Sequence, residues 1–410
     1  MESLPAASTS QKQHENEEND SFVTLGFFLP FLAEASTFFN HDHGKSDLEE
    51  FFRFEKDFGK MYSSESERWE RFGVFSANLR RIKSHNGQPG ITYTVGINEF
   101  ADISDEEFKL VHLHGYSGSP RMNLLKVKPT SNEVETADLP SEVDWRKRGV
   151  VTPVKDQGYC GSCWAFATVE QVESYYALAN NGSQTLLAPQ QLVSCMDNPD
   201  QCGGTGGCAG ATAELGMGYI SQHGLVKESD LPYKSGTSGV DETCPSDLTH
   251  PELKVKDFGL LPSNDVEAVK KHLATVGPLA VSVDASGWFS RYTGGVFHGC
   301  DYSKDIDIGH AVQLVGYGTD AAGQGDYWLI RNSWGPHWGE DGYIRLKRES
   351  TEVCGFDSKP QDGVGCRGQN DTVRVCGMCG ILYDSVYPIG VHKVKNSEES
   401  MGNSVEQFLN

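Results

Sequence analysis

The chain has 410 residues, which is enough for two or three domains and at least one sizeable hydrophobic core. Its hydrophobic fraction of 38% and its 45 glycines are typical of a globular, loop-rich protein. The formal net charge of -22 at pH 7 argues against nucleic acid as a partner, because the phosphates would be repelled. Such a balance is typical of a secreted protein or of a protein from an acidic compartment.

The 11 cysteines are an odd number. In an oxidising compartment they predict up to five disulfides and one remaining thiol, which is either surplus or a nucleophile. A reduced cytosolic protein with scattered cysteines is the alternative. Two N-x-[ST] triplets, at Asn181 and Asn370, match the glycosylation acceptor pattern and are compatible with secretion.

Residues 22–33 form an apolar run that is followed by Ala33-Glu34-Ala35, which resembles a signal cleavage site. The run is too short to span a bilayer. The segment before it is acidic and unusually long for a signal peptide. We expect residues 1–35 to be a signal segment with an atypical N-terminus; a mis-assigned start and an uncleaved anchor are the alternatives. No other segment predicts a membrane span.

The predicted elements change in type along the chain. Helical periodicity covers residues 47–86, and a short strand is expected within 91–97. Residues 119–137 lack a periodic pattern and are expected to be a linker. Helices are then expected at 163–180, 189–194 and 207–223, and strands from about residue 254 onwards. A mainly helical half followed by a mainly β half predicts two packed lobes with a cleft between them.

Residues 160–166 read CGSCWAF, and the two cysteines have different surroundings. Cys163 opens the helix expected at 163–180, where free N–H groups and partial positive charge favour a thiolate and lower the thiol pKa. Cys160 lies outside that helix. Cys163 is therefore the better nucleophile and Cys160 the better disulfide partner. Two structural cysteines, a redox pair or half of a zinc site are the alternatives.

A thiolate nucleophile needs a base nearby. His310 opens the apolar run HAVQLVGYG, where a strand can hold it. Asn332 follows the next strand-like run, and its amide can fix an imidazole by accepting a ring N–H. Trp334 follows two residues later and can shield that hydrogen bond from water. A lone histidine beside a strand is usually only structural, so the following Asn and Trp carry the argument.

The blocks CGSCWAF, GHAVQLVGYG and NSWGPHWGEDGYIR resemble the three catalytic blocks of the papain family of cysteine proteases. The resemblance implies an α+β, two-lobed papain-like fold, with a mainly helical amino-lobe and a mainly β-barrel-like carboxy-lobe. It also implies Cys163 as nucleophile, His310 as acid and base, Asn332 as orienter and Trp334 as shield. Gln157 matches the glutamine that helps to form the oxyanion hole, with the Cys163 backbone N–H as second donor.

The N-terminal helical stretch resembles a cathepsin L-like propeptide. Six residues at steps of three or four lie on one helix face and match its interspersed motif: Glu67, Arg71, Phe75, Asn78, Ile82 and Asn86. Glu67 and Arg71 are expected to form an i,i+4 pair. A shorter motif follows with Gly96, Asn98, Phe100 and Asp102. A generic amphipathic helix is the alternative, which the second motif disfavours.

The resemblance therefore implies an autoinhibited zymogen with an inhibitory propeptide at 47–118, a linker at 119–137, a catalytic domain at 138–392 and a polar tail at 393–410. The mature enzyme is expected to begin near residues 138–140. We hypothesise that carboxylates such as Asp102 are protonated in acid and lose their partners, which releases the propeptide.

The resemblance also implies three disulfides: Cys160–Cys208, Cys195–Cys244 and Cys300–Cys379. The pairing of Cys202, Cys354, Cys366 and Cys376 stays open. Three of these four lie in 347–378, which is longer than usual for the family. We expect its stretch KPQDGVGCRGQNDTV to be an inserted loop held by its own disulfide; a tolerated surface loop and a docking element are the two interpretations of its role.

The positions that match the family's substrate-binding residues are Gly210, Ala213, Ser282, Ala311 and Asp384. The second pocket is matched to Ala213, Ser282, Ala311 and Asp384, and the first three have small side chains, which implies a roomy pocket. Asp384 at its base would accept Arg or Lys, while small walls still admit Phe or Leu; the alternative is that Asp384 turns to solvent. Two departures from the family are Ala211, where a glycine is usual, and Gly309, where many members carry aspartate.

The expected function is a cysteine endopeptidase, directed to a lysosome or vacuole or secreted, and monomeric. Its expected partners are peptide and protein substrates, its own propeptide and cystatin-like inhibitors. No cofactor, metal ion, nucleic acid or stable membrane span is implied. A catalytically silent binding protein is one alternative, which the presence of Cys163 disfavours. An exopeptidase on the same fold is the other, and the 347–378 insertion keeps it open.

Overall fold

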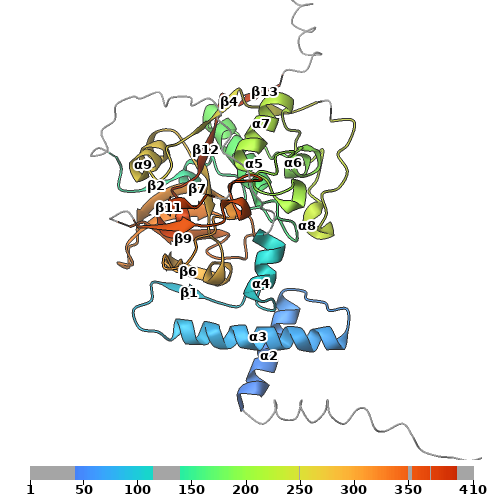
Figure 1. Cartoon of the computed structure of the whole chain (residues 1–410), viewed down its shortest axis with the longest axis vertical. Coiled ribbons are helices and arrows are strands. Elements are labelled where there is room, and N and C mark those ends of the chain that lie inside the picture. Colours follow the sequence, from blue (N-terminus) through green and yellow to red (C-terminus); the bar gives the residue numbers. More distant parts are fainter. Residues whose placement is uncertain (1–41, 114–138, 249, 350–352, 370, 395–410) are drawn as a thin grey trace, which may run out of the picture. The chain divides into compact units, whose positions relative to one another are not determined.

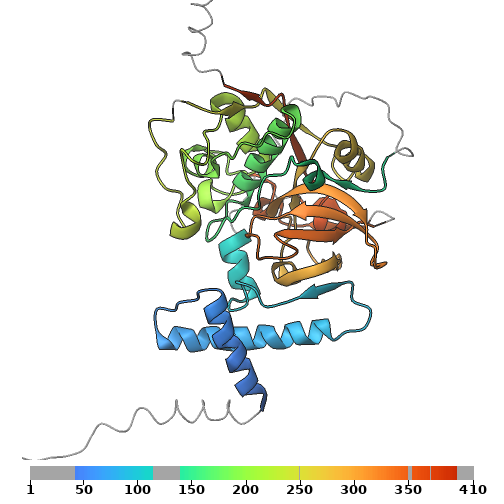
Figure 2. The ribbon, with the colours of Figure 1, turned by 180° about the vertical axis from the view of Figure 1, so that it is seen from behind.

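The computed structural model describes residues 42–113, 139–248, 250–349, 353–369 and 371–394, which Figure 1 and Figure 2 draw in colour. The chain divides into two compact units, residues 1–53 and residues 54–410. The expected signal segment, the linker, Asn370 and nearly all of the polar tail lie outside the described residues. Within the described ranges, no helix is long and apolar enough to cross a bilayer.

The N-terminal helical region contains two helices, α2 (Asp42–Asp57) and α3 (Glu65–Asn86). The chain breaks between them because Gly59 takes a φ of +60° and Ser64 caps α3, accepting from the Glu67 backbone N–H at 3.2 Å. Strand β1 (Tyr93–Val95), helix α4 (Asp105–Phe108) and a π-helical turn (Lys109–Leu113) follow. The expected strand at 91–97 is thus present in its central three residues.

The first lobe of the second unit is helical. It contains α5 (Cys163–Ala179), α6 (Pro189–Cys195), α7 (Ala213–His223) and the short α8 (Ser235–Ser238). The core of this lobe gathers apolar side chains from α5, α6 and α7, such as Val169, Leu192 and Met217. In Figure 1 these helices are green and lie together.

The prediction of one helix at 207–223 was wrong in its first third. Gly206, Gly207 and Gly210 take φ values of 104°, 57° and 87°, which are not helical. Only a 3-10 turn (Gly207–Ala209) forms before α7 begins. The glycines therefore shape a loop in front of α7, and the helical pattern alone did not reveal it.

The second lobe is built on a nine-stranded sheet in the order β1-β6-β9-β8-β7-β5-β12-β4, with β2 also pairing with β7. All pairs are antiparallel except β6 with β9. Its strands are β2 (Val143–Asp144), β4 (Asp257–Leu260), β5 (Leu279–Val283), β6 (Tyr292–Phe297), β7 (His310–Thr319), β8 (Asp326–Arg331), β9 (Tyr343–Lys347) and β12 (Ser385–Ile389), together with β1. Its core contains Leu314, Ile330 and Ile344.

Smaller elements complete the lobe. Two further ribbons are β10 (Cys354–Asp357) with β11 (Val373–Cys376) and β3 (Leu253–Lys254) with β13 (His392–Lys393). The remaining elements are α9 (Val266–Thr275) and 3-10 turns at Trp145–Arg148, Gly287–Arg291, Pro360–Asp362 and Met378–Gly380. Helix α5 of the first lobe packs against β5, β7 and β12, so the two lobes share one contact surface.

Candidate active site

Cys163 is the first residue of α5 and is buried. The Cys160–Cys208 disulfide holds the turn before it, and no side chain caps the first N–H groups of the helix. Such a helix terminus carries partial positive charge, which stabilises a thiolate. The backbone N–H of Ala311, on β7, donates to the Cys163 Sγ at 3.5 Å. This contact joins the two lobes at the thiol.

His310 is the first residue of β7 and is fully buried. Its Nε2 lies 2.8 Å from Asn332 Oδ1, which also accepts from the Ser333 backbone N–H at 2.8 Å. Because that oxygen accepts, Nε2 carries the ring proton and Nδ1 is the basic nitrogen. In the described part of the chain, Nδ1 has no hydrogen-bond partner. The imidazole can therefore take up a proton there.

The Trp334 ring covers this histidine. The two rings stack with centroids 4.7 Å apart and an interplanar angle of 26°. Burial lowers the pKa of His310 to about 4, and its hydrogen bond with Asn332 acts in the opposite direction. In the covered state His310 is therefore neutral at pH 7.

Gln157 lies in the loop before α5 and is fully buried. Its Oε1 accepts from the Ser333 hydroxyl at 2.7 Å. Its Nε2 donates to the Cys160 carbonyl at 3.0 Å and lies 3.4 Å from the carbonyl of His112, a residue of the N-terminal region. The amide that would meet an oxyanion is therefore in contact with the N-terminal region.

Aromatic side chains of the N-terminal region complete the cover over the site. The rings of Phe100 and Phe108 meet Trp334 edge-on, with centroids 5.6 Å and 5.1 Å apart. His112 stacks on Phe108 at 5.0 Å and is buried. Burial lowers the pKa of His112 to about 4, and the neighbouring His310 acts in the same direction. The N-terminal region thus packs on the residue that covers His310.

Two of these site residues were not expected from the sequence. Ser333 donates to Gln157, and its position directly after Asn332 in the same sequence block could have indicated that it lies in the site. His112 gave no comparable signal, because residues 109–113 show no periodicity and form a π-helical turn.

Comparison with known proteins decides the family. The model of papain family cysteine proteases matches residues 139–364, and that of the cathepsin propeptide inhibitor domain matches residues 51–108. Vignain of Phaseolus vulgaris is 35% identical over 363 residues, which cover 86% of this chain and 95% of that protein. The chain belongs to the papain family of cysteine proteases.

Two further papain-family relatives agree with this. A cathepsin L-like proteinase of Phaedon cochleariae is 35% identical over 318 residues, covering 76% of this chain and 92% of that protein. The solved structure of digestive procathepsin L 3 from the Tenebrio molitor larval midgut has a TM-score of 0.67 and 31% identity. It covers 84% of this chain and 99% of that chain. The protein is thus a cysteine endopeptidase with an inhibitory propeptide domain on the two-lobed papain-like fold.

The propeptide motif residues connect α3 to the rest of the second unit. Asn78 Nδ2 donates to the carbonyls of Ala101 and Ile103, and Asn86 exchanges two hydrogen bonds with Val95 of β1. Phe75 and Ile82 are buried. The expected Glu67–Arg71 pair was wrong: Glu67 accepts from Ser63, and Arg71 forms its ion pair with Glu107 at 2.7 Å.

The second propeptide motif lies against the sheet lobe. The Gly96 backbone N–H donates to the Arg291 carbonyl at 2.9 Å, and Asn98 Nδ2 donates to the Ser290 carbonyl at 2.7 Å. Phe100 is buried beside Trp334. Asp102 is buried and accepts from Lys60 at 2.9 Å and from Tyr62 at 3.0 Å.

The residues matched to the family's second substrate pocket lie in β5, in β7, at the start of α7 and directly before β12. Ser282 on β5 is paired with Ala311 on β7, and its hydroxyl donates to the Asp384 Oδ2 at 2.9 Å. Ala213 is the first residue of α7, and Gly210 precedes it in the glycine-rich loop. Asp384 is therefore drawn towards Ser282 rather than turned only to solvent.

All 11 cysteines lie within the described residues, and ten form disulfides. Cys160–Cys208, Cys195–Cys244 and Cys300–Cys379 are the pairs that the resemblance implied. The four others pair as Cys354–Cys376, within the insertion, and Cys202–Cys366. The insertion is thus held by a disulfide of its own, Cys354–Cys376, as expected, and Cys366 additionally ties it to the other lobe. Cys163 keeps its thiol.

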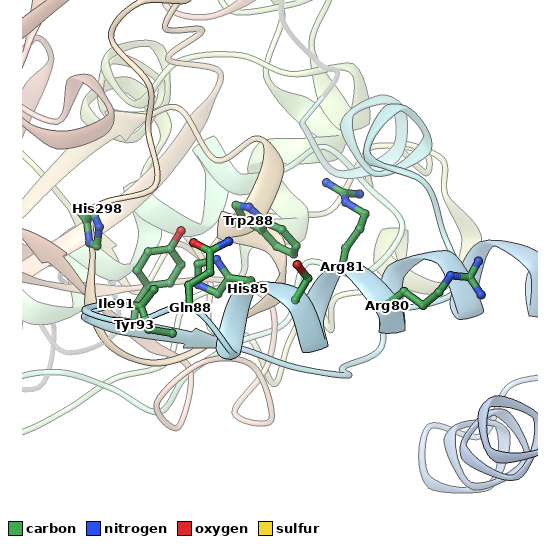
Figure 3. Close-up of a pocket in the computed structure, with 9 residues that line it drawn as sticks. Arg80, Arg81, His85, Gln88, Ile91, Tyr93, Trp288 and His298 are labelled. Atoms are coloured by element: carbon green, nitrogen blue, oxygen red, sulfur yellow. The ribbon is translucent and has the colours of Figure 1, made fainter. Parts of the chain in front are cut away.

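A cavity of about 580 Å³ lies away from Cys163 and His310, between the propeptide and the sheet lobe (Figure 3). Its labelled lining residues include Arg81 and His85 of α3, Tyr93 of β1, and Trp288 and His298 of the sheet lobe. The Arg81 guanidinium lies 4.9 Å from the Trp288 ring centroid, and the His85 ring lies 5.1 Å from it. These contacts hold propeptide and catalytic domain together.

Proposed function

We propose that Cys163 is the nucleophile of this protease, His310 its general acid and base, and Asn332 the residue that orients His310. The observation that carries the proposal is the 2.8 Å hydrogen bond from His310 Nε2 to Asn332, which reserves Nδ1 for proton transfer. The position of Cys163 at the N-terminus of α5 supports it, because that position stabilises a thiolate.

In the proposed reaction, His310 Nδ1 first takes the proton of the Cys163 thiol, and the resulting thiolate attacks the carbonyl carbon of the scissile peptide bond. His310 donates a proton to the departing amine, the C–N bond breaks and a thioester remains. His310 then takes a proton from water, whose oxygen attacks the thioester and returns the thiolate. The Gln157 amide and the Cys163 backbone N–H would donate to the oxyanion of both tetrahedral intermediates, which lowers both barriers.

The proposed zymogen is a chain with an inhibitory propeptide at 47–118, a linker at 119–137, a catalytic domain at 138–392 and a polar tail at 393–410. The contact of the His112 carbonyl with Gln157 supports this organisation, because it puts the propeptide against a proposed oxyanion donor. The mature enzyme would begin near residues 138–140, and residues 1–35 would direct the chain into the secretory pathway.

The proposed location is a lysosome or vacuole, or the outside of the cell. The five disulfides support an oxidising route of synthesis. Asn181 is exposed, as a glycosylated asparagine must be, and Asn370 is the second proposed acceptor. Cystatin-like inhibitors and a monomeric state are proposed by resemblance to the family.

The second substrate pocket is proposed to accept basic side chains through Asp384. The change Asp384→Asn is expected to lower kcat/KM about tenfold for an Arg-Arg substrate and to leave a Phe-Arg substrate within about twofold, because only the former loses its ion pair. Steady-state hydrolysis of the two fluorogenic amides measures this. An enzyme that takes Leu and Phe but no Arg at any pH would contradict the assignment.

The proposed nucleophile and zymogen are tested together by acidifying the full chain to about pH 4.5, in wild type and in Cys163→Ala. Band size and hydrolysis of a Phe-Arg amide are followed. We expect the wild type to shorten to a species beginning near Leu139 and to hydrolyse the amide, while Cys163→Ala does neither. A wild type whose Cys163 does not react with iodoacetamide after propeptide removal would instead support a catalytically silent binding protein.

A further inference from the structure

The insertion in the sheet lobe contains a segment, residues 360–366, that we call the strap. It lies between β10 and β11, and its base is firmly held. Ser358 donates from its backbone and its hydroxyl to Asp305, and the Asp357 side chain is buried and accepts from the Lys359 backbone N–H. The Cys354–Cys376 disulfide closes the ribbon below the strap. One end of the strap is therefore fixed to the sheet lobe.

The other end of the strap is fixed to the helical lobe. Cys366 forms a disulfide with Cys202, a residue 164 positions earlier. The Gly203 backbone N–H donates to the Gly365 carbonyl at 3.0 Å. The next residue, Arg367, donates from its backbone N–H to the Asp200 carbonyl at 3.3 Å and from its Nε to Gln201 at 2.9 Å. The strap thus bridges the two lobes through a covalent bond and one hydrogen bond, and Arg367 directly after it adds two more hydrogen bonds.

On the sheet lobe, the strap lies directly before the proposed acid and base. A side chain at Gly363 would have its Cβ 3.0 Å from the Ile308 carbonyl oxygen and 3.5 Å from the Gly309 nitrogen. These two residues precede His310 and Ala311 on the same wall. The backbone of the strap therefore lies in contact with the chain that leads into one side of the proposed second substrate pocket.

On the helical lobe, Gly203, which donates to the strap at Gly365, lies against the residues that lead into the other side of the same pocket. A Cβ at Gly203 would be 2.7 Å from the Ala211 carbonyl oxygen and 2.8 Å from the Thr212 Cγ2. These residues lie between Gly210 and Ala213, which are matched to substrate binding. The middle of the strap and the segment to which its second end is bonded therefore both lie beside residues that lead into the proposed second pocket, and the strap bridges the lobes at that end of the site.

We propose that the strap closes the acyl side of the substrate groove beyond the second residue from the scissile bond, so that the enzyme favours peptide bonds near the amino end of its substrates. The inference rests on the proposed function of Cys163 and of the pocket residues. An extended substrate advances about 3.3 Å per residue, so a third and fourth residue would meet the strap backbone. A segment tied at both ends cannot swing aside as an ordinary loop does.

The test compares two fluorogenic amides on the acid-activated full chain: Phe-Arg with a free amine, and the same dipeptide extended by Ala-Ala. Alkylation of Cys163 gives the active-site concentration, and peptide mapping without reductant verifies the Cys202–Cys366 bond. We expect kcat/KM for the extended amide to be lower by about tenfold or more in the wild type, because the additional residues gain no subsite.

Two variants open the strap. One is Cys202→Ser with Cys366→Ser; the other replaces residues 358–372 by Asn-Gly, a tight hairpin turn, together with Cys202→Ser. Both are expected to raise kcat/KM for the extended amide about tenfold and to leave Phe-Arg within about twofold. The matched control is Cys354→Ser with Cys376→Ser, which removes a disulfide from the same insertion but keeps the Cys202–Cys366 bond between the lobes. We expect this variant to retain the wild-type ratio of kcat/KM for the extended amide to kcat/KM for Phe-Arg.

Equal rates on both amides in the wild type, or an unchanged ratio in both opened variants, would overturn the strap inference while the proposed chemistry stands. A chain that hydrolyses neither amide and whose Cys163 does not alkylate would overturn the proposed function, and the strap inference with it. Similar gains from the opened variants and from the matched control would also overturn it, because general loosening of the insertion would then explain the effect.

Discussion

Gln157 stands where the propeptide and the proposed oxyanion hole meet. The change Gln157→Ala is expected to lower kcat by about 100-fold with little change in KM, because its amide would bind the oxyanion of the transition state rather than the substrate. Steady-state kinetics on the activated enzyme measure this. Ser333→Ala removes only the hydroxyl that donates to the Gln157 Oε1, and we expect it to lower kcat by less than Gln157→Ala does. A raised KM at unchanged kcat would contradict the assignment.

His112 provides a physical cause for propeptide release in acid. Its pKa is lowered to about 4 by burial, whereas an exposed histidine titrates near pH 6.5. The released segment therefore binds a proton between about pH 6.5 and pH 4, while the docked segment does not. Docking is fully stable above this window and weakens as the pH falls through it, by up to about 3 kcal/mol.

The change His112→Phe keeps the ring on Phe108 but removes the titration. We expect its propeptide to be released at a pH about one unit lower than in the wild type, because the proton uptake that favours release is lost. Processing rates between pH 4 and pH 7 measure this, with exposed His392→Phe as the control. An unchanged pH midpoint would exclude His112 as a cause.

Protonation of Glu99 has the opposite effect on propeptide docking from protonation of His112. Burial raises its pKa to about 7, so the docked state binds its proton more tightly than an exposed carboxyl does, and this contribution to docking grows as the pH falls. Net release in acid therefore requires groups that disfavour docking when protonated. His112 is one of these groups. Asp102 accepts from Lys60 and Tyr62, and its role in propeptide release stays a hypothesis.

At the scale of elements, the propeptide extends the sheet of the enzyme. Strand β1 pairs antiparallel with β6, and Tyr93 lies opposite Gly295. The C-terminal part of α3 then lies over the loop that contains Trp288, with Arg81 and His85 on its ring. Main-chain pairing fixes the register, and these ring contacts add affinity.

Trp288→Ala is expected to speed propeptide release about tenfold at a fixed acidic pH, because one cation–π and one aromatic contact are lost. The proteolytic activity of the mature enzyme should be unchanged, since Trp288 does not contact the proposed catalytic residues. The processing half-time measures the effect, and Trp288→Phe is expected to retain most of the wild-type rate. Identical half-times for Ala and wild type would show that the contacts of Trp288 do not limit propeptide release.

At the scale of the whole molecule, buried charges join the two lobes. Arg331 of β8 lies 3.2 Å from Glu170 of α5, and both are fully buried. Glu173 of α5 is 3.1 Å from Lys155 and accepts from Thr152, whose carbonyl accepts from Arg331 at 2.6 Å. This cluster ties the helix that begins with Cys163 to the strand that ends before Asn332.

Arg331→Met is expected to lower the free energy of unfolding by about 3–5 kcal/mol, because Glu170 would lose its buried partner. The corresponding fall in Tm is about 10 °C. Thermal unfolding of the Cys163→Ala chain at pH 7 measures this without autolysis. The matched control is Arg345→Met, which breaks partly exposed ion pairs with Asp320 and Glu340. We expect it to lower the free energy of unfolding by much less than Arg331→Met does. Equal losses would argue against a special role for the buried cluster.

The class of chemistry, peptide hydrolysis by a cysteine protease, could be predicted from the sequence, and the individual catalytic residues stay a prediction. The proposed nucleophile and base are marked by their immediate neighbours: a turn and a helix start around Cys163, and a strand start at His310. The papain-like fold and the propeptide also followed, because their motifs are dense and local. The glycine loop before α7 was mispredicted, since hydrophobic periodicity carries no information about positive φ angles.

Tertiary structure decided which distant groups meet. Four cysteines allow three pairings, and only the closeness of residues 164 positions apart selects Cys202–Cys366 and creates the strap. The contact of the His112 carbonyl with Gln157 and the pairing of Arg71 with Glu107 arose in the same way. The sequence by itself thus determined the family and the class of its chemistry, because both depend on motifs of neighbouring residues. The tertiary structure decided the covering of the site and the bridge between the lobes, because these depend on chain segments that only folding brings together.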